Sequence, residues 1–442
     1  MAYNSLLISK GLLLASERSI SIDIFNSKDE KLINDFCKLQ KYRVVIDTMK
    51  NVDSRQTLQE NINWLETSLM NRISRLTDAV KYMRIECQDV QKHLSPSDVA
   101  IEFFIESDTI YALILKKDFD APKLIQLSKA AFDEPYSNTA MYKGIWQPLE
   151  KYFSTEGNIY FSPSGILHTL AIEHAPINNE EIISDRYKHL YRVSSTRNIA
   201  LSVAHNTDNT AAIFGGIEYY AEKDTIVKYF ADIYRGGNME DWKELKNTGA
   251  EAMSIDTILK QKGFRTEMLT KSAASEENFK RLSGGNYRIM HIATHGYFHA
   301  DSTAYDNLTN SALVFAGVNI TKPEDDIDDG LLTAREISRM DLRNTDLVVL
   351  SACKTALGTV TSEGVFGIQR GFKKAGANTI VMSVKKVYDA ATKEFMVEFY
   401  KNMIDNRLPK HEAFVSAVHA MRKKYPNDPD KWATFIMLDG GN

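Results

Sequence analysis

The chain has 442 residues, enough for two or three domains with cores of their own. Hydrophobic residues make up 43% of it, charged residues 25%, and the formal net charge is −4, so the composition excludes a disordered chain and gives no reason to expect nucleic acid. No stretch reaches the roughly 18 apolar residues of a membrane span, and the apolar run near the N-terminus lacks the basic start and the cleavage site of a signal peptide. We expect a cytoplasmic protein that binds neither a membrane nor nucleic acid directly.

The three cysteines, Cys37, Cys87 and Cys353, are an odd and sparse set without Cys-x-x-Cys spacing. This pattern argues against a disulfide framework, a zinc site and a thioredoxin-type redox pair. Reduced thiols in a reducing compartment fit better, and a catalytic thiol has to stay reduced. We therefore expect no metal and no cofactor, and we expect Cys37 and Cys87 to pack within helices.

The first quarter of the chain has the spacing of two amphipathic helices. A capping box at Ser27 to Glu30 precedes apolar residues at helical spacing as far as Ile46. A longer apolar series runs from residue 58 to 83, and its helix should end before Ser95-Pro96. We predict a helical hairpin region over residues 1–96 whose apolar stripes pack within the chain. The alternative is a coiled-coil surface for a partner.

The apolar pattern then changes to that of strands, and later to alternating strands and helices. Residues 99–106 and 110–116 predict a hairpin, and residues 158–176 predict two strands around a Pro-Ser-Gly turn. The further predicted strands lie at 211–217, 264–269, 288–294, 346–352 and 378–383. The predicted helices lie at 249–262, from 275, at 333–340, at 364–375 and in two terminal segments. This alternation predicts an α/β fold with a largely parallel sheet covered by helices.

Two of these strands end in residues that can do chemistry. The strand at 288–294 leads into His295-Gly296, and the strand at 346–352 leads into Cys353. Functional groups in open α/β sheets gather beyond the carboxyl ends of the strands, and a thiol becomes a good nucleophile beside an imidazole. Cys353 and His295 are thus a candidate nucleophile and base, with the N–H groups of Gly296 and Cys353 as oxyanion donors. Each residue alone also fits a packing role.

Other enzyme classes lack their motifs. The sequence contains no phosphate-binding or dinucleotide-binding glycine loop, no His-Glu-x-x-His and no Gly-x-Ser-x-Gly. A cysteine phosphatase would have arginine six positions after the thiol, where this chain has Thr359.

Several ordered motifs resemble those of CHAT-domain proteases, which are related to caspases and separases and often carry tetratricopeptide repeats. The motifs are H-I-A-T-H-G (291–296), L-L-T-A-R-E-I (331–337), L-S-A-C-K-T-A-L-G (350–358), E-G-V-F-G-I-Q-R-G-F-K-K-A-G-A (363–377), F-S-P-S-G-I-L-H-T-L-A-I-E-H-A-P (161–176) and K-W-A-T-F-I-M-L-D-G (431–440). The resemblance covers about residues 130–442. It implies a caspase-like fold, with a non-catalytic half over 97–210 and a catalytic half over 211–442.

The same resemblance implies a function. His295, immediately before glycine, would be the catalytic histidine and Cys353 the nucleophile of a cysteine endopeptidase. Such an enzyme would be regulated and would cut one or a few protein partners, often in bacterial immunity or cell death. We therefore expect a protein substrate and a regulatory protein partner. The rival hypothesis is a caspase-like scaffold whose Cys-His pair is silent.

One segment departs from the family pattern. Where relatives commonly read S-L-W-x-V-D-D, this chain has S-V-K-K-V-Y-D over residues 383–389. Asp389 remains, either to select a basic residue on the substrate or to cap the helix that follows, and Lys385 and Lys386 would weaken that selection if they face the cleft. Glu363 opens a predicted helix, where it complements the helix dipole or contacts substrate.

The remaining candidates carry weaker signals. The acidic run at 324–329 is a solvated loop, or else an acidic rim or a flap that is mobile at rest and orders or is cut on activation. His291 lies within a predicted strand, as a core residue or as support behind the site. His168 and His299 are expected in loops or turns.

Overall fold

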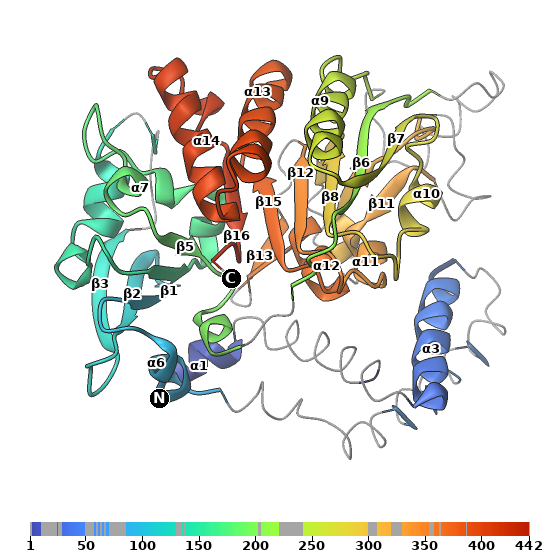
Figure 1. Ribbon diagram of the computed structural model, residues 1–442. Helices are drawn as coiled ribbons and strands as arrows, with labels where there is room; N and C mark the ends of the chain where they lie inside the picture. Colours follow the sequence, from blue (N-terminus) through green and yellow to red (C-terminus); the bar gives the residue numbers. More distant parts are fainter. Residues whose placement is uncertain are drawn as a thin grey trace.

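The computed structural model describes residues 2–9, 24, 29–48, 57–58, 61, 64–65, 68–69, 85–129, 135–136, 138–201, 205–220, 242–298, 307–319, 329–352, 358–361, 364–385 and 387–441. Its central feature is a sheet of eleven strands in the order β3-β2-β1-β4-β5-β16-β15-β12-β8-β6-β7 (Figure 1). Seven of the ten pairings in this sheet are parallel, and the exceptions are β1 with β2, β2 with β3 and β15 with β16. The predicted α/β class with a mostly parallel sheet is confirmed.

The strands of this sheet come from two parts of the chain. The first part supplies β1 (Val99–Glu106), β2 (Thr109–Leu115), β3 (Lys123–Lys129), β4 (Ile159–Ser162) and β5 (Leu190–Arg192). The second supplies β6 (Thr210–Ile217), β7 (Arg265–Lys271), β8 (Ile289–Ala293), β12 (Leu347–Ser351), β15 (Thr379–Ser383) and β16 (Phe435–Leu438). β5 and β16 pair directly, so the sheet continues from one part into the other. The division at residues 97 and 211 stays a prediction.

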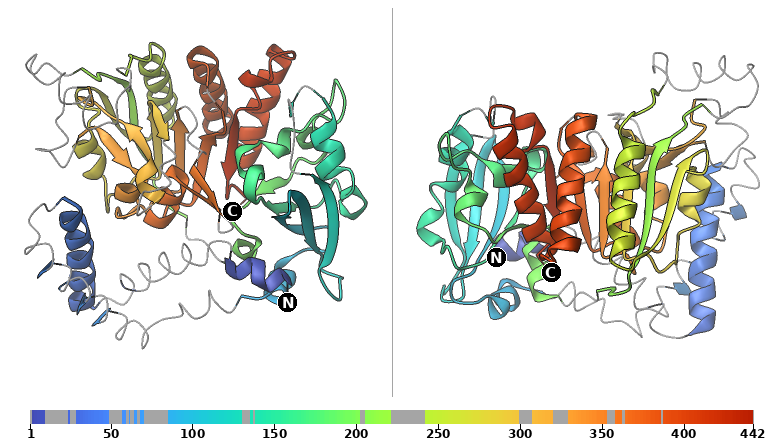
Figure 2. Two further views of the ribbon diagram at one scale, coloured as in Figure 1. Left: turned by 180° about the vertical axis from the view of Figure 1, so that it is seen from behind. Right: turned by 45° about the horizontal axis from the view of Figure 1, so that its top comes forward.

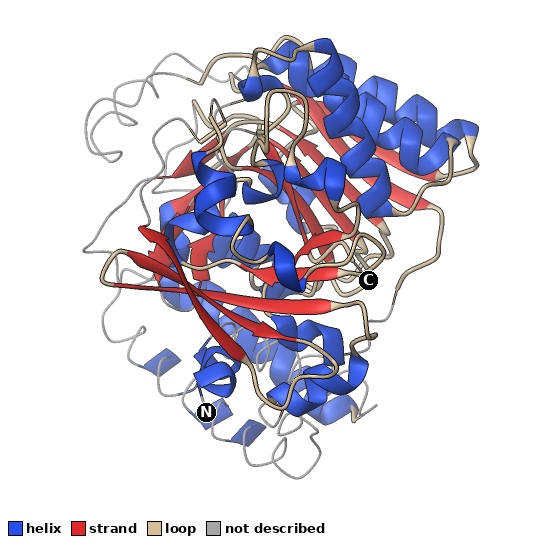
Figure 3. Cartoon of the chain, turned by 90° about the vertical axis from the view of Figure 1, so that its left-hand side faces the viewer, coloured by secondary structure: helices blue, strands red, loops and turns tan. Residues whose placement is uncertain are grey.

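Helices cover both faces of the sheet (Figure 3). On one face α9 (Thr248–Gln261), α13 (Asp389–Tyr400) and α14 (Lys410–Lys424) lie side by side, as the right-hand view of Figure 2 shows. On the other face are α10 (Glu276–Lys280), α11 (Ala334–Ile337) and α12 (Ile368–Ala375). Strand alternation explains this division. In β6, Phe214 packs on Phe279 of α10, whereas the adjacent Ile213 pairs with His291, which contacts α9.

Two small sheets complete the second part. β9 (Gly296–Phe298), β10 (Ser311–Val314) and β11 (Leu331–Thr333) form one, and β13 (Gly358–Thr361) pairs with β14 (Gly364–Gly367) in the other. The helix predicted from residue 364 therefore begins only at Ile368, with Gly367 as its N-cap. Gly364 and Gly367 are poor helix formers, and they pair with Thr361 and Gly358 instead.

The predicted second strand within residues 158–176 is wrong. β4 is followed by two short 3₁₀ turns, Gly165–Thr169 and Ile172–His174. Buried side chains donate hydrogen bonds to carbonyl groups that a second strand would pair with its neighbour. Trp146 Nε1 donates to the Ile172 carbonyl at 2.7 Å, and the Arg192 guanidinium donates to the Leu170 carbonyl at 2.6 Å. The hairpin predicted before this segment is confirmed, with Ser107 and Asp108 at positive φ in its turn.

The N-terminal region has a core of its own. In α3 (Glu30–Thr48) the first turn is capped by Asp29, whose Oδ1 accepts from the Leu32 N–H at 3.0 Å. The predicted capping residue Ser27 lies outside the described residues. A separate cluster forms from the buried apolar side chains of this region: Ile24, Leu32, Leu39, Leu58, Leu65 and Leu69. The described residues of these apolar stripes thus pack within the chain, whereas most of the predicted helix at 58–83 lies outside the described residues. In Figure 1 and in the left-hand view of Figure 2, α3 lies apart from the sheet.

The helix α1 (Ala2–Ser9) docks beside α6 (Cys87–His93) on the outer side of β1 and β2. Its Tyr3 hydroxyl lies 2.8 Å from Thr196 Oγ1. Cys87 begins α6 and is partly buried against the same cluster, as expected, whereas the side chain of Cys37 in α3 lies outside the described residues. None of the helices among the described residues is long and apolar enough to cross a membrane.

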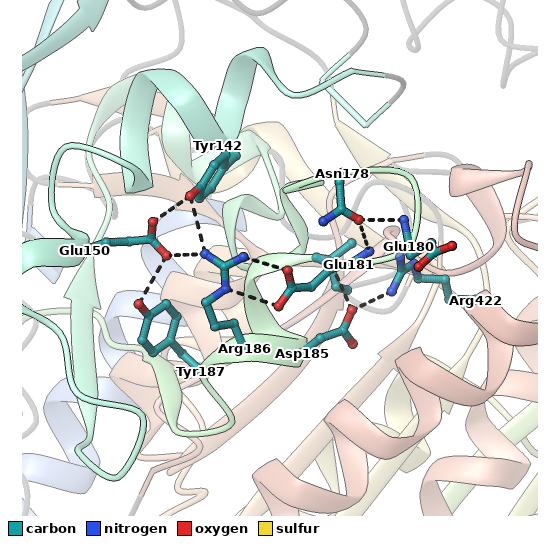
Figure 4. Close-up of polar contacts among 10 residues, drawn as sticks. Tyr142, Glu150, Asn178, Glu180, Glu181, Asp185, Arg186, Tyr187 and Arg422 are labelled. Atoms are coloured by element: carbon teal, nitrogen blue, oxygen red, sulfur yellow. Dashed lines mark hydrogen bonds and ion pairs between the residues drawn. The ribbon is translucent and has the colours of Figure 1, made fainter.

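An ion-pair cluster joins the first part of the chain to α14 (Figure 4). In α7 (Ile183–Arg186), Arg186 lies 2.8 Å from Glu150 and 2.6 Å from Glu181. The neighbouring Asp185 accepts from Arg422 of α14 at 2.6 Å. The Asp185–Arg422 pair ties α14 to α7, and the Arg186 pairs hold α7 to Glu150 and Glu181 within the first part of the chain.

Candidate active site

The carboxyl ends of β8 and β12 lie side by side. The two strands are parallel, with Ala293 paired to Ser351, and the Thr294 N–H donates to the Ser351 carbonyl at 3.2 Å. His295 is two residues beyond Ala293, and Cys353 is two residues beyond Ser351 in the sequence. Cys353 itself lies outside the described residues, so the structure gives no distance from it to His295. The register predicts that the two side chains meet at this edge.

A third strand fixes the residue before the cysteine. Ser383, at the end of β15, donates its hydroxyl hydrogen to the Ala352 carbonyl at 2.5 Å. Both Ala352 and Ser383 are buried. The backbone that leads to Cys353 is therefore anchored on both sides, by β8 and by β15.

His295 is held between two aromatic rings. Its centroid lies 5.0 Å from that of Trp242 and 5.1 Å from that of Tyr219. Its Nε2 lies 2.7 Å from the Lys243 carbonyl oxygen. Because a carbonyl only accepts, Nε2 carries the hydrogen, and in the neutral ring Nδ1 is then the basic nitrogen. This tautomer is suited to accept a proton at Nδ1.

The surroundings of His295 favour its neutral form. Burial between the rings lowers its pKa below the usual range, and it outweighs the opposing effects of the Lys243 carbonyl and the carboxylate of Asp389. Burial also raises the pKa of Tyr219 to about 12, so its phenol is neutral, and the phenol oxygen lies 3.1 Å from Thr294 Oγ1. A neutral imidazole is the form that can act as a general base.

Asp389 is placed near this histidine, but not as the cap of its own helix. α13 begins at Asp389, with Tyr388 as N-cap, so the capping hypothesis for α13 is wrong. The Asp389 carboxylate instead accepts from both the backbone N–H and the side-chain amide of Asn247, each at 2.9 Å. Asn247 is the N-cap of α9, and a carboxylate at this end complements the helix dipole. Selection of a basic substrate residue stays a prediction.

The other pocket candidates are only partly described. Glu363, Lys386, His299 and residues 324–328 lie outside the described residues, so the predicted mobility of the acidic run is not tested. Lys385 pairs with Asp430 at 2.9 Å and lies over the Tyr136 ring. His168 lies in the 3₁₀ turn Gly165–Thr169, as expected. No group of three or more metal-ligating side chains suited to a metal ion occurs in the part of the chain that is described.

His291 belongs to a buried polar network on the α9 face. It is 0% exposed, its Nε2 lies 2.9 Å from Glu251 Oε1, and its Nδ1 lies 3.4 Å from the Tyr400 hydroxyl. Burial, and then the nearby Glu251, raise the pKa of Tyr400 well above its usual range. These contacts make His291 a satisfied core histidine that ties β8 to α9 and α13.

Sequence reasoning missed the groups that surround His295. Tyr219 follows β6, the neighbour of β8, and its position at a strand end was a usable signal. Trp242 lies in a polar segment without periodicity. Lys243 contacts His295 through its backbone carbonyl group, and no pattern of side chains in the sequence predicts such a contact.

Comparison with known proteins identifies the family. The model of the CHAT domain matches residues 137–440. Tetratricopeptide repeat protein 28 of Mus musculus is 34% identical over 110 residues, and its Homo sapiens counterpart 32% over 109. Each of these matches covers 24% of this chain and 4% of the relative, so the chain matches only a small part of these relatives.

Similar solved structures include a cysteine proteinase and a separase–securin complex. The Arg-specific cysteine proteinase gingipain R has a TM-score of 0.41 and 12% identity, over 66% of this chain and 64% of that one. The separase–securin complex of Saccharomyces cerevisiae gives 0.38 and 13%, over 64% of this chain and 15% of that one. The family match spans more than half of the 442 residues, and the chain therefore belongs to the CHAT domain family.

Proposed function

We propose that this chain is a cysteine endopeptidase in which Cys353 is the nucleophile and His295 is the general base. The observation that supports this proposal best is the hydrogen bond from His295 Nε2 to the Lys243 carbonyl, at the end of a strand whose parallel neighbour leads into Cys353. The bond leaves Nδ1 as the proton acceptor. Membership of the CHAT family and the order of the motifs support the same assignment.

The mechanism is an acyl transfer in two steps. His295 Nδ1 takes the proton of the Cys353 thiol as the sulfur attacks the carbonyl carbon of the peptide bond. The backbone N–H groups of Gly296 and Cys353 hold the oxyanion that develops. The C–N bond then breaks, and Nδ1 gives its proton to the departing amine. A water molecule, deprotonated by the same nitrogen, hydrolyses the thioester and restores the thiol.

The electrostatics around His295 favour its neutral form. Burial lowers the pKa of His295, which disfavours the imidazolium that a preformed thiolate–imidazolium pair would need. As pH falls through the pKa of His295, the base is protonated and activity is lost.

The substrate and partners are proposals as well. We propose a protein substrate and a regulatory protein partner in the cytoplasm, with Asp389 and Glu363 as candidates for substrate selection. The Asp389 carboxylate binds Asn247, and it acts on a basic substrate residue only if the second oxygen faces the bound peptide. Profiling a peptide library tests this point, because equal cleavage after leucine and arginine would remove the selective role of Asp389.

Labelling by a thiol-reactive peptide probe tests the function directly. The wild-type chain should be labelled at Cys353 and should cleave a peptide library, and Cys353→Ala should lose several orders of magnitude of activity with its fold intact. Cys37→Ala and Cys87→Ala are the matched controls and should leave activity nearly unchanged. Wild-type turnover by Cys353→Ala would refute the assignment. A folded wild-type chain without labelling or cleavage would support the rival function, a silent scaffold.

A further inference from the structure

Asn319 binds the backbone of Trp242 through both ends of its side-chain amide. Its Oδ1 accepts from the Trp242 N–H at 3.1 Å, and its Nδ2 donates to the Trp242 carbonyl at 3.0 Å. Asn319 is only 5% exposed, so these bonds form away from bulk water. An amide is suited to this pairing because it offers one acceptor and two donors in one plane, whereas a carboxylate offers no donor.

The backbone of Asn319 holds the other side of His295. Its N–H donates to the Tyr219 carbonyl at 3.1 Å, and nearby the Gly317 N–H donates to the Glu218 carbonyl at 3.2 Å. Asn319 is therefore bonded to both residues whose rings flank the imidazole, Tyr219 through its main chain and Trp242 through its side chain. No motif in the sequence marks this residue.

We propose that Asn319 is a positioning residue: through Trp242 it holds the Lys243 carbonyl against His295 Nε2 and so fixes the tautomer whose Nδ1 accepts the thiol proton. Lys243 directly follows Trp242, so the carbonyl that accepts from His295 belongs to the peptide group next to the clamped one. This inference rests on the proposed peptidase function for its kinetic consequence, but the control of the tautomer does not depend on activity.

The segment 242–247 is fixed at a second point, which makes the effect of Asn319 separable from folding. At its far end Asn247 is bound by Asp389 and begins α9. Loss of the Asn319 amide therefore leaves α9 anchored and frees only the residues next to His295. We expect a local change in the imidazole and its carbonyl acceptor, with the sheet and the helices unchanged.

Nitrogen NMR of the full chain labelled with ¹⁵N-histidine tests this proposal. The chain has ten histidines, and a His295→Gln sample identifies the signals of His295. In the wild type the neutral ring should be the Nε2–H tautomer. In Asn319→Ala the ring should exchange between both tautomers. The readout is the tautomer ratio and not the pKa, because loss of the Lys243 carbonyl lowers the pKa of His295 whereas gain of water raises it.

The kinetic test separates positioning from binding. In Asn319→Ala kcat should fall by about 10- to 100-fold with KM little changed, as expected when a misplaced group acts only in the transition state. The matched control is Asn198→Ala, which also removes two amide bonds, to Ser194 and Asp439, far along the chain from His295. This control should keep the wild-type tautomer and kcat.

Asn319→Asp covers the case in which the alanine variant does not fold. The aspartate keeps the shape and the acceptor for the Trp242 N–H but turns an oxygen toward the Trp242 carbonyl, so it should disturb the His295 tautomer as well. A folded Asn319→Ala or Asn319→Asp chain in which His295 keeps a pure Nε2–H tautomer overturns the proposal. A changed tautomer in a chain that never cleaves peptides would uphold the positioning role and refute the peptidase function alone.

Discussion

Glu276 should make the stability of this protein fall as the pH rises from 5 to 8. This first residue of α10 is 2% exposed, and its Oε2 accepts from the Gly330 N–H at 2.8 Å. Its Oε1 lies 2.6 Å from the Lys280 ammonium, which is also 2.8 Å from Glu336. One lysine thus forms ion pairs with two carboxylates. Burial, followed by the charge of Glu336, raises the pKa of Glu276 to about 8.

The sign and the size follow from proton linkage. The pKa in the folded chain, about 8, is above the unfolded value of 4.5. The stabilising contribution is therefore fully present below pH 4.5 and is lost as the pH rises through 8. In between, the unfolded chain releases a proton that the folded chain retains, so each pH unit costs about a factor of ten in the folding equilibrium. Over the whole range we expect the free energy of unfolding to fall by about 3 to 5 kcal/mol in total. The figure is a range because Glu276 shares Lys280 with Glu336.

Glu276→Gln isolates this effect. Glutamine cannot ionise, yet its amide oxygen still accepts from the Gly330 N–H. Chemical denaturation from pH 5 to 8.5 should show a free energy of unfolding that, relative to the wild type, increases with pH. Glu336→Gln is the control: it removes the like charge, so the pKa of Glu276 should drop and the wild-type slope should become shallower. A difference between wild type and Glu276→Gln that stays constant over this range would refute the reasoning.

Two further predictions concern the surroundings of the candidate site. Trp242→Ala exposes His295 to water and should raise the pKa of its imidazole. The acidic limb of the pH profile of kcat/KM should therefore move to higher pH. A limb that does not move would show that the indole does not shield the imidazole. Gly371→Ala places a Cβ 2.5 Å from the Ala334 carbonyl oxygen, so thermal unfolding should show that the free energy of unfolding falls by about 1–3 kcal/mol. An increase of up to ~1 kcal/mol, as helix propensity alone would give, would contradict this close packing.

The part of the site built on regular strands was predictable. β8 and β12 are mostly apolar and are buried at every residue, the pattern of central parallel strands, so the sequence alone places His295 and the start of the cysteine loop at one edge of the sheet. The same pattern reading failed for residues 164–176, where Arg192 and Trp146 bind carbonyl groups from far along the chain. The apolar periodicity indicates which side of an element a residue faces. It does not indicate which distant donor will form a hydrogen bond with the carbonyl group of that residue.

Short elements and backbone contacts were not predicted from the sequence, for related reasons. β5, β9 and β11 have three residues each, too few for an alternation to stand out, although β5 makes the junction with β16. Asp389 was singled out from the sequence as a substrate-pocket residue or a cap of its own helix, whereas its contact with the N-terminus of α9 requires knowing that α9 and α13 pack together. Such long-range pairings between polar groups have no local sequence signal.

The position and the protonation of His295 therefore come from different parts of the chain. The sheet sets the position, since β8 is paired on both sides and is tied to α9 through His291 and Glu251. The tautomer depends on the Lys243 carbonyl, which belongs to an irregular segment held by side chains. A neutral imidazole accepts a proton only at the ring nitrogen that carries no hydrogen, and here a second element, which binds the other nitrogen, sets which one that is. In this fold that element follows β6 by about 25 residues, which is why a strand-end motif alone does not define the site.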